Sequence, residues 1–220
     1  MNKAVIFDLD GTLIDSLGDI HAALNDVLQL RNAPPLALAT VRGLIGKGSA
    51  NLVRRALVAQ NLPIDEASCG SALADFLRLY SADSAKLTTV FNGVIDVLDR
   101  LQDGGFCLGV CTNKPLAPTK IVLDQFGLTR FFDSIVGGDQ LASRKPDPAM
   151  LFHAMACLGA TSCLFVGDSE IDRETADAAG QPFALFTEGY RTNSIEALNP
   201  EYYFNEYEEL LNIVNIEQKK

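Results

Sequence analysis

Basic residues and long apolar runs are scarce in this chain. Its 18 lysines and arginines stand against 28 aspartates and glutamates, which gives a formal net charge of −10. Nucleic acids and anionic membrane surfaces are bound through basic patches, so we expect neither as a partner. No segment approaches the roughly 18 consecutive apolar residues of a transmembrane helix. The same charge would repel an anionic metabolite, so a phosphate substrate has to be met by a few local cations.

Histidines are few and paired cysteines are missing. His21 and His153 are far apart in the sequence, which argues against a zinc site. The five cysteines include no CxxC pair and mostly lie in apolar stretches, so we expect reduced core residues of a cytoplasmic protein. The start of the chain carries a lone Lys3 and an apolar run of four residues, which is too little for a secretory signal peptide.

Short apolar segments without two-residue alternation recur along the chain, as expected for strands that are buried on both faces. They are Ala4–Phe7, Phe106–Cys111, Ser134–Val136, Cys163–Val166, Phe183–Phe186 and a weaker one at Tyr202–Phe204. Helical patterns lie between or after the later ones, at Val94–Leu101, Pro115–Phe126, Pro148–Leu158, Ile171–Ala179 and Tyr207–Val214. This alternation predicts a parallel sheet with right-handed crossovers, that is, a Rossmann-like α/β core.

Residues 17 to 84 have a different pattern, with helical periodicity and no strand-like run. Apolar residues recur there on one helical face, as at Leu17, Ile20, Leu24, Val27 and Leu28. We therefore predict a small all-helical cap of residues 16–84, inserted after the first strand. Residues 1–15 and 85–220 would form the α/β core.

The segment AVIFDLDGTLIDS, residues 4–16, takes a buried strand directly into Asp8 and Asp10. Two carboxylates so close repel each other, so a cation or a reaction should compensate. Ligands of a parallel sheet bind at the carboxyl ends of its strands. The later strands are followed by further polar residues, namely Thr112, Asn113, Lys114, Lys145, Asp168 and Asp172. These strand ends predict one polar site at a single edge of the sheet.

The segments FDLDGTLIDS, CTNKP, RKPDP and VGDSEID carry a family resemblance. Their order and strand-end positions resemble those of the haloacid dehalogenase superfamily, in its branch with a small helical cap of the C1 type. The segments VRGLIGKGSANLVRRAL, VGGDQLASRKPDP and LFTEGYR look closer still to bacterial phosphoglycolate phosphatases. The resemblance implies a phosphatase that hydrolyses 2-phosphoglycolate, a small phosphate ester, to glycolate and phosphate through an aspartyl-phosphate intermediate.

Phosphate monoesters hydrolyse very slowly unaided, so such an enzyme needs a nucleophile, a proton donor and charge neutralisation. Asp8 is the expected nucleophile. Asp10 is expected to protonate the leaving oxygen and then to act as base on the attacking water. Mg²⁺ prefers oxygen ligands, and Asp8, the main-chain carbonyl of Asp10 and Asp168 are expected to hold it.

The phosphoryl oxygens would be held by Thr112 and by the main-chain N–H of Asn113. Lys145 would neutralise charge on the nucleophile and on the phosphate, and Asp172 would orient Lys145 or a metal-bound water. Gly11 and Thr12 are expected to allow the sharp turn that leads into the cap. In the predicted cap, Lys47 lies between two glycines and is the first candidate to pair with the substrate's carboxylate, with Arg42 second.

Several alternatives compete with this prediction. A dehalogenase of this fold has no alkoxide to protonate, so Asp10 argues against it. A phosphomutase typically has a bulkier apolar residue at the position of Thr12. A non-catalytic binding protein would be expected to have lost one of the acids or Lys145. Another phosphate ester (a sugar phosphate, a nucleotide or pyrophosphate) stays open as the substrate, and so does the choice between monomer and dimer.

Overall fold

The computed structural model describes residues 3–83 and 85–217. Residues 1–2, 84 and 218–220, which the predicted core and cap include, lie outside the described residues. Within the described part, no helix has both the length and the apolar character needed to cross a bilayer.

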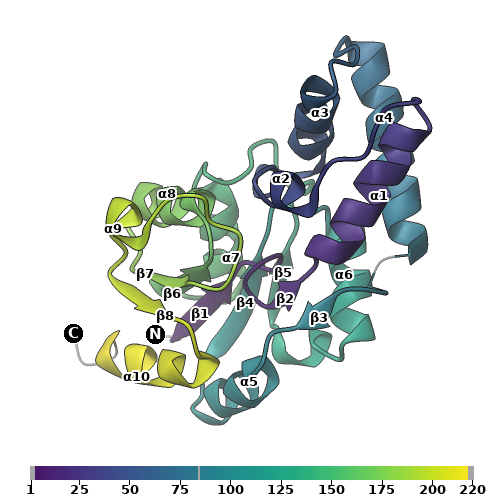
Figure 1. The fold of residues 1–220 in the computed structure, drawn as a ribbon. Helices are drawn as coiled ribbons and strands as arrows, with labels where there is room; N and C mark the ends of the chain where they lie inside the picture. The colour runs from purple at the N-terminus through teal and green to yellow at the C-terminus, as the bar shows by residue number, and fades with distance from the viewer. Residues whose placement is uncertain (1–2, 84, 218–220) are drawn as a thin grey trace.

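A six-stranded parallel sheet forms the centre of the molecule, in the order β5-β4-β1-β6-β7-β8 (Figure 1). Its strands are β1 (Ala4–Phe7), β4 (Cys107–Cys111), β5 (Ser134–Val136), β6 (Cys163–Gly167), β7 (Phe183–Phe186) and β8 (Tyr202–Phe204). The predicted α/β fold with a parallel sheet is therefore confirmed. The first strand lies between β4 and β6, which brings the segments after these three strands together at one edge.

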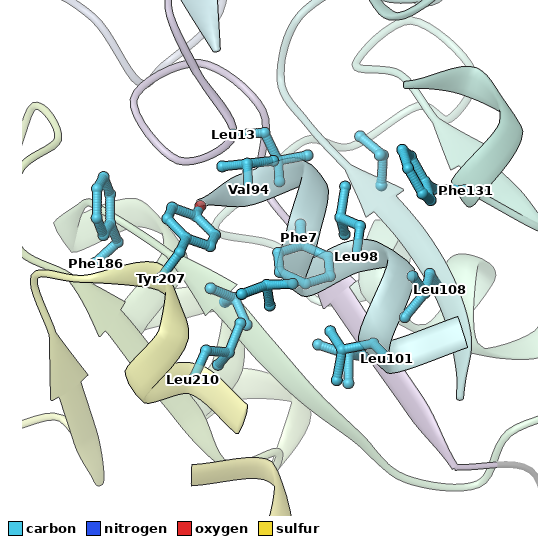
Figure 2. Packing of buried hydrophobic residues seen from close by; sticks show 14 of the residues in the cluster. Phe7, Leu13, Val94, Leu98, Leu101, Leu108, Phe131, Phe186, Tyr207 and Leu210 are labelled. Atoms are coloured by element: carbon cyan, nitrogen blue, oxygen red, sulfur yellow. The ribbon is translucent and has the colours of Figure 1, made fainter. Parts of the chain in front are cut away.

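Helices cover both faces of the sheet. They are α5 (Val94–Asp103), α6 (Leu116–Gln125), α7 (Ala149–Cys157), α8 (Glu170–Ala179), α9 (Ile195–Leu198) and α10 (Tyr207–Glu217), with a 3₁₀ turn η1 at Thr129–Phe131. The side chains of β1 alternate between the two layers: Val5 and Phe7 pack towards α5 and α10, whereas Ala4 and Ile6 pack towards α7. Figure 2 shows Phe7 within this layer, together with Leu98 of α5 and other apolar side chains. Because both of their faces are buried, β1, β6 and β7 carry no polar side chain.

Four helices lie between β2 (Ile14–Asp15) and β3 (Thr89–Val90) and stand to one side of the sheet (Figure 1). We call them the helical insert: α1 (Leu17–Gln29), α2 (Leu38–Arg42), α3 (Ser49–Ala59) and α4 (Glu66–Asp83). They share an apolar cluster that contains Leu24, Leu28, Leu52, Val53 and Phe76. This separate cluster supports a cap of residues 16–84 on a core of 1–15 and 85–220, a division that stays a prediction.

The antiparallel pair of β2 and β3 was not predicted. Ile14 pairs with Val90 and Asp15 pairs with Thr89 at the point where the chain enters and leaves the helical insert. Strands of two residues are too short to show a periodic pattern, which explains why the sequence did not indicate them.

Candidate active site

The register of the sheet brings three predicted site residues to one edge. Phe7 is paired with Val110 of β4 and with Val166 of β6, so the residues that follow leave the sheet side by side. Asp8 is among them, and its main-chain N–H donates to the carbonyl of Val166 at 2.8 Å. Thr112 follows β4 and Asp168 follows β6, so these two side chains flank Asp8 on either side.

The turn after β1 contacts Asp168 closely. Gly11 has a φ of 90°, and a Cβ at this position would lie 2.4 Å from Oδ2 of Asp168, so only glycine fits here. Thr12 Oγ1 donates to Oδ1 of Asp168 at 2.7 Å, and the main-chain N–H of Tyr190 donates to Oδ2 at 2.6 Å. Thr12 therefore fixes the Asp168 carboxylate in addition to forming the turn.

Lys145 lies between two carboxylates. Its Nζ is 2.9 Å from Oδ1 of Asp8 and 2.6 Å from Oδ1 of Asp172, and its side chain is only 1% exposed. The contact with Asp8 lies outside hydrogen-bond geometry, so Oδ1 of Asp8 has an ion pair but no hydrogen bond among the described residues. Burial lowers the pKa of Lys145, but the charges of Asp172 and Asp8 outweigh burial and hold the pKa above its ordinary value. The ammonium is therefore charged at neutral pH.

Asp172 caps helix α8 while it holds Lys145. Its Oδ2 accepts from Ser169 Oγ at 2.6 Å and from the main-chain N–H of Ser169 at 3.2 Å, in a capping box. The other oxygen, Oδ1, is the one that contacts Lys145. Because the helix fixes one side of the carboxylate, the position of the lysine is fixed as well.

Asp8, Asp168 and Asp172 form an acidic cluster whose carboxylate oxygens lie within 4.8 Å of one another. Burial raises the pKa of Asp8 to about 6, although the charge of Lys145 opposes the change. Burial also raises the pKa of Asp168 well above its ordinary value, and the charges of Asp172 and Asp8 add to the effect. A cation beside these oxygens would favour their ionised forms.

Among the four aspartates and two lysines that contact one another in the site, negative charges outnumber positive ones by two. Asp8, Asp168 and Asp172 share Lys145, whereas Asp10 pairs with Lys114. Four carboxylates against two ammonium groups leave the charge of one divalent cation. The donor set consists of carboxylate oxygens, which Mg²⁺ prefers, so the residues present fit this ion. The cluster contains Asp172, which was not among the predicted ligands. A ligand role for the main-chain carbonyl of Asp10 stays a prediction.

Asp10 is held from two sides. Lys114 Nζ lies 3.0 Å from Oδ1 and 3.2 Å from Oδ2, and Ser16 Oγ donates to Oδ1 at 2.6 Å. Lys114 was expected at this edge of the sheet but was given no role, and Ser16 was not predicted as a site residue. The position of Lys114, directly after Thr112 and Asn113 at a strand end, was the available signal.

The side chain of Asn113 links three segments of the site. Its Nδ2 donates to the carbonyls of Gly46 at 2.9 Å and of Lys145 at 3.0 Å, and its Oδ1 accepts from the main-chain N–H of Lys145 at 3.0 Å. Only the main-chain N–H of Asn113 was predicted to have a role. The amide also joins the glycine-flanked loop of the helical insert to the core.

Two cavities meet at Asp8 and Asp10. The larger has a volume of about 410 Å³ and is lined by Lys47, Asn51 and Arg55 of the helical insert, together with Asp168, Glu170 and other core residues. The smaller, about 60 Å³, lies beside Lys114 and Thr112 under an apolar wall. That wall consists of Ile20, Ile45, Leu52, Phe76, Leu77 and Tyr80.

The structure separates the two predicted cap cations. Lys47 is exposed and lines the larger cavity, as does Arg55, which the sequence analysis missed. Arg42 is not among the residues that line either cavity beside Asp8. Its guanidinium donates to the carbonyl of Gly189 and lies 5.9 Å from the centre of the Tyr190 ring.

Tyr190 is a further residue that the sequence analysis did not single out. Its hydroxyl donates to Oδ1 of Asp15 at 2.8 Å and accepts from the main-chain N–H groups of Ser16 and Leu17. The hydroxyl of Tyr190 thus fixes the start of α1, which Asp15 and Tyr190 cap together. The only signal in the sequence was its place in the segment LFTEGYR.

Comparison with known proteins supports these observations. The model of the haloacid dehalogenase-like hydrolase family matches residues 5–186. A phosphoglycolate phosphatase of Cereibacter sphaeroides is 44% identical over 206 residues, which cover 94% of each chain. A phosphoglycolate phosphatase of Rhodobacter capsulatus is 40% identical over 214 residues, 97% of each chain.

Solved structures agree with the sequence relatives. A crystal structure described as a predicted phosphoglycolate phosphatase from Haemophilus somnus 129PT superimposes with a TM-score of 0.89 at 30% identity. The match covers 96% of this chain and 97% of that one. With the fold, the site geometry and the sequence in agreement over nearly the whole length, the chain belongs to the haloacid dehalogenase-like hydrolases.

Proposed function

We propose that this protein is a Mg²⁺-dependent phosphatase that hydrolyses 2-phosphoglycolate to glycolate and phosphate. Phosphoglycolate phosphatases that are 40–45% identical over 94–97% of the chain support the substrate. One structural observation carries the chemistry: Asp8 lines both cavities, while its buried Oδ1 is held in an ion pair with Lys145 at 2.9 Å. The ion pair fixes the carboxylate on one side, and the side chain borders the space in which a substrate would lie.

In the first step, Asp8 attacks the phosphorus atom. A bond forms between its carboxylate oxygen and phosphorus, the bond from phosphorus to the ester oxygen breaks, and Asp10 gives its proton to the departing glycolate oxygen. In the second step, Asp10 takes a proton from a water molecule that attacks the aspartyl-phosphate. Phosphate is released and Asp8 is regenerated. The separation of the two acids into different environments, one beside Lys145 and one beside Lys114, supports these different roles.

The phosphoryl group is held by Thr112, by the main-chain N–H of Asn113 and by Lys145. Asp172 keeps Lys145 in place, as its 2.6 Å contact supports. Asp8, the main-chain carbonyl of Asp10 and Asp168 would hold Mg²⁺, which when bound supplies positive charge to the phosphoryl oxygens.

Lys47 binds the carboxylate of the substrate. Its side chain is exposed on the wall of the larger cavity, so it can turn towards an anionic group. Arg42 remains the second candidate, but its guanidinium is already bonded to the carbonyl of Gly189. Lys47 is therefore the stronger of the two.

A phosphate-release screen over a few dozen phosphomonoesters, with Mg²⁺ present, tests this function. We expect the highest kcat/KM with 2-phosphoglycolate. A clear preference for a sugar phosphate, a nucleotide or pyrophosphate would reject 2-phosphoglycolate as the substrate but would leave the proposed phosphatase mechanism intact. No hydrolysis of any ester would overturn the phosphatase itself.

We also propose a cytoplasmic location. All five cysteines are free thiols, as is usual in reducing compartments. The expectation that they lie in the core was only partly right: Cys111 and Cys163 are buried, whereas Cys157 is exposed on α7. Cell fractionation with an antibody against the chain tests the location, and recovery in a membrane or extracellular fraction would contradict it.

A further inference from the structure

Lys114 is a buried cation that the proposed function leaves without a role. Its side chain is 5% exposed, on the segment that follows β4. A buried ammonium is costly unless hydrogen bonds and opposite charge surround it. Lys114 has both, since its three N–H groups face three acceptors: Oδ1 of Asp10 at 3.0 Å, Oδ2 of Asp10 at 3.2 Å and the hydroxyl of Tyr80 at 2.6 Å.

The two aspartates after β1 thus each have their own lysine. Lys145 contacts Asp8 and Lys114 contacts Asp10. Since all three acceptors near Lys114 belong to the protein, the ammonium is occupied before any substrate binds. Its position therefore suits it to hold a side chain in place better than to bind an anion.

The two oxygens of Asp10 are held differently. Oδ1 accepts from Ser16 Oγ at 2.6 Å and from Lys114 at 3.0 Å, whereas Oδ2 has only the longer contact with Lys114. Two short hydrogen bonds fix Oδ1, which leaves Oδ2 as the oxygen to exchange a proton with the leaving group.

Tyr80 connects this arrangement to the helical insert. It lies on α4, is buried, and stacks on Phe76 with ring centres 5.6 Å apart and an interplanar angle of 11°. Its hydroxyl reaches across to Lys114, which belongs to the core. The lysine has its full set of acceptors only while α4 is seated against the core.

We propose that Lys114, held by Tyr80 of the helical insert, is the positioning residue of Asp10, so that the acid is aimed at the leaving oxygen only when the insert is seated. This inference rests on the proposed function, because it needs Asp10 to act as a proton donor. It makes the insert part of the proton-transfer machinery in addition to its role in substrate recognition.

The way in which kcat/KM depends on the leaving group distinguishes a positioning role of Lys114 from a structural one. A poor leaving group such as an alkoxide needs a proton from Asp10, whereas 4-nitrophenolate leaves readily without one. The value of kcat/KM reports steps up to the transfer of the phosphoryl group to Asp8, so the later hydrolysis of the intermediate does not enter it. Three substrates are needed: 2-phosphoglycolate, 2-hydroxyethyl phosphate, which lacks the carboxylate, and 4-nitrophenyl phosphate.

Lys114→Met should lower kcat/KM for both alkyl esters by about 10- to 100-fold, within the usual contribution of general acid catalysis. Its kcat/KM for 4-nitrophenyl phosphate should change by less than about threefold, since that step needs little proton donation. Tyr80→Phe keeps the stacked ring and removes only the hydroxyl, so we expect the same pattern with a smaller loss. Lys120→Met and Tyr203→Phe, at exposed positions on α6 and β8, are matched controls that should leave all three values unchanged.

Other results would overturn the inference. If Lys114→Met lowers kcat/KM equally for all three substrates, Lys114 has a structural role. If it lowers kcat/KM only for 2-phosphoglycolate, Lys114 binds the substrate's carboxylate. If it lowers none of the three values, Lys114 does not contribute to catalysis. If thermal melting shows that Lys114→Met does not fold, the pattern of Tyr80→Phe decides. Asp10→Asn tests the proposed acid separately from its positioning by Lys114. If this variant shows no loss selective for the alkyl esters, the role of Asp10 as acid and the role of Lys114 both fail.

Discussion

At the scale of single residues, Asp8 is the side chain on which the proposed chemistry depends. Asp8→Asn keeps the shape of the side chain, but an amide cannot form the bond to phosphorus. We expect phosphate release to fall to the background while the thermal unfolding curve changes little. Asp26→Asn, at an exposed position of α1, is the matched control. Turnover near that of the wild type, measured on protein free of host phosphatases, would reject Asp8 as the nucleophile.

Lys47 is the proposed partner of the substrate's carboxylate in the helical insert. Loss of a charge-assisted hydrogen bond in a closed site costs about 1.5–3 kcal/mol, or roughly 10- to 150-fold. Lys47→Ala should therefore raise KM for 2-phosphoglycolate by that factor and change the hydrolysis of 4-nitrophenyl phosphate little. Lys120→Ala is the control for loss of a surface charge.

Two other outcomes for Lys47→Ala would have a clear meaning. An equal loss on both substrates would assign Lys47 to closure of the insert or to the phosphate. If activity on neither substrate falls, Arg42 or Arg55 would be the residue that binds the carboxylate. Arg55 lines the same cavity as Lys47.

The cysteines give a prediction about reactivity and pH. Burial raises the pKa of Cys111 and of Cys163 to about 12 each, from an ordinary value of 9.0. At pH 9 an ordinary thiol is about half ionised, whereas a thiol of pKa 12 is ionised to about one part in a thousand. Iodoacetamide should therefore label the exposed Cys157 in the folded protein and reach Cys111 and Cys163 only after unfolding. Peptide mass spectrometry checks this, and rapid labelling of Cys111 in the folded state would contradict it.

At the scale of elements, the joint between the core and the helical insert depends on a buried acid. Asp19 of α1 accepts from the main-chain N–H groups of Ala85, Leu87 and Thr88 at 2.8–3.2 Å, and also from the hydroxyl of Thr88. One carboxylate thereby ties the first helix of the insert to the segment that returns to the core.

Asp19→Ala should destabilise the fold, because it leaves several buried N–H groups without their acceptor. We expect the free energy of unfolding in urea to fall by about 2–4 kcal/mol, given roughly 1–3 kcal/mol for a buried donor left unsatisfied. Asp26→Ala removes an exposed acid from the same helix and should change it by less than about 0.5 kcal/mol. A similar small effect of both variants would show that Asp19 does not hold the joint.

At the scale of the whole molecule, the acidic cluster predicts that metal affects activity and stability together. Exhaustive chelation should abolish phosphate release, Mg²⁺ should restore it, and Ca²⁺ should not, because its longer bonds and higher coordination number would misplace Asp8. A ligand at 100 times its Kd adds about 2.7 kcal/mol to the free energy of unfolding, so Mg²⁺ should also raise the melting temperature.

Asp168→Asn is the matched variant for this experiment. It should lose most of the Mg²⁺-dependent rise in melting temperature, since one of the proposed ligands is gone. Full activity in the presence of EDTA would remove the metal from the mechanism. An equal rise in melting temperature for the variant and the wild type would place the ion elsewhere.

The sequence by itself determined the strands, most helices and the edge of the sheet where the site lies. Strands buried on both faces must be apolar at every position, so segments such as Ala4–Phe7 and Cys163–Val166 are visible locally. A parallel sheet places polar residues after its strands at one edge, and for that reason Asp8, Thr112 and Asp168 were found. These inferences need only local pattern and topology.

Only the tertiary structure decided which polar groups touch. Lys114 is 104 residues from Asp10 and 34 from Tyr80, and the hydroxyl of Tyr190 lies 175 residues along the chain from Asp15. A periodic pattern gives the face on which a side chain lies but not its partner across the molecule. Partners are set by how distant segments pack together, which sums many weak contacts.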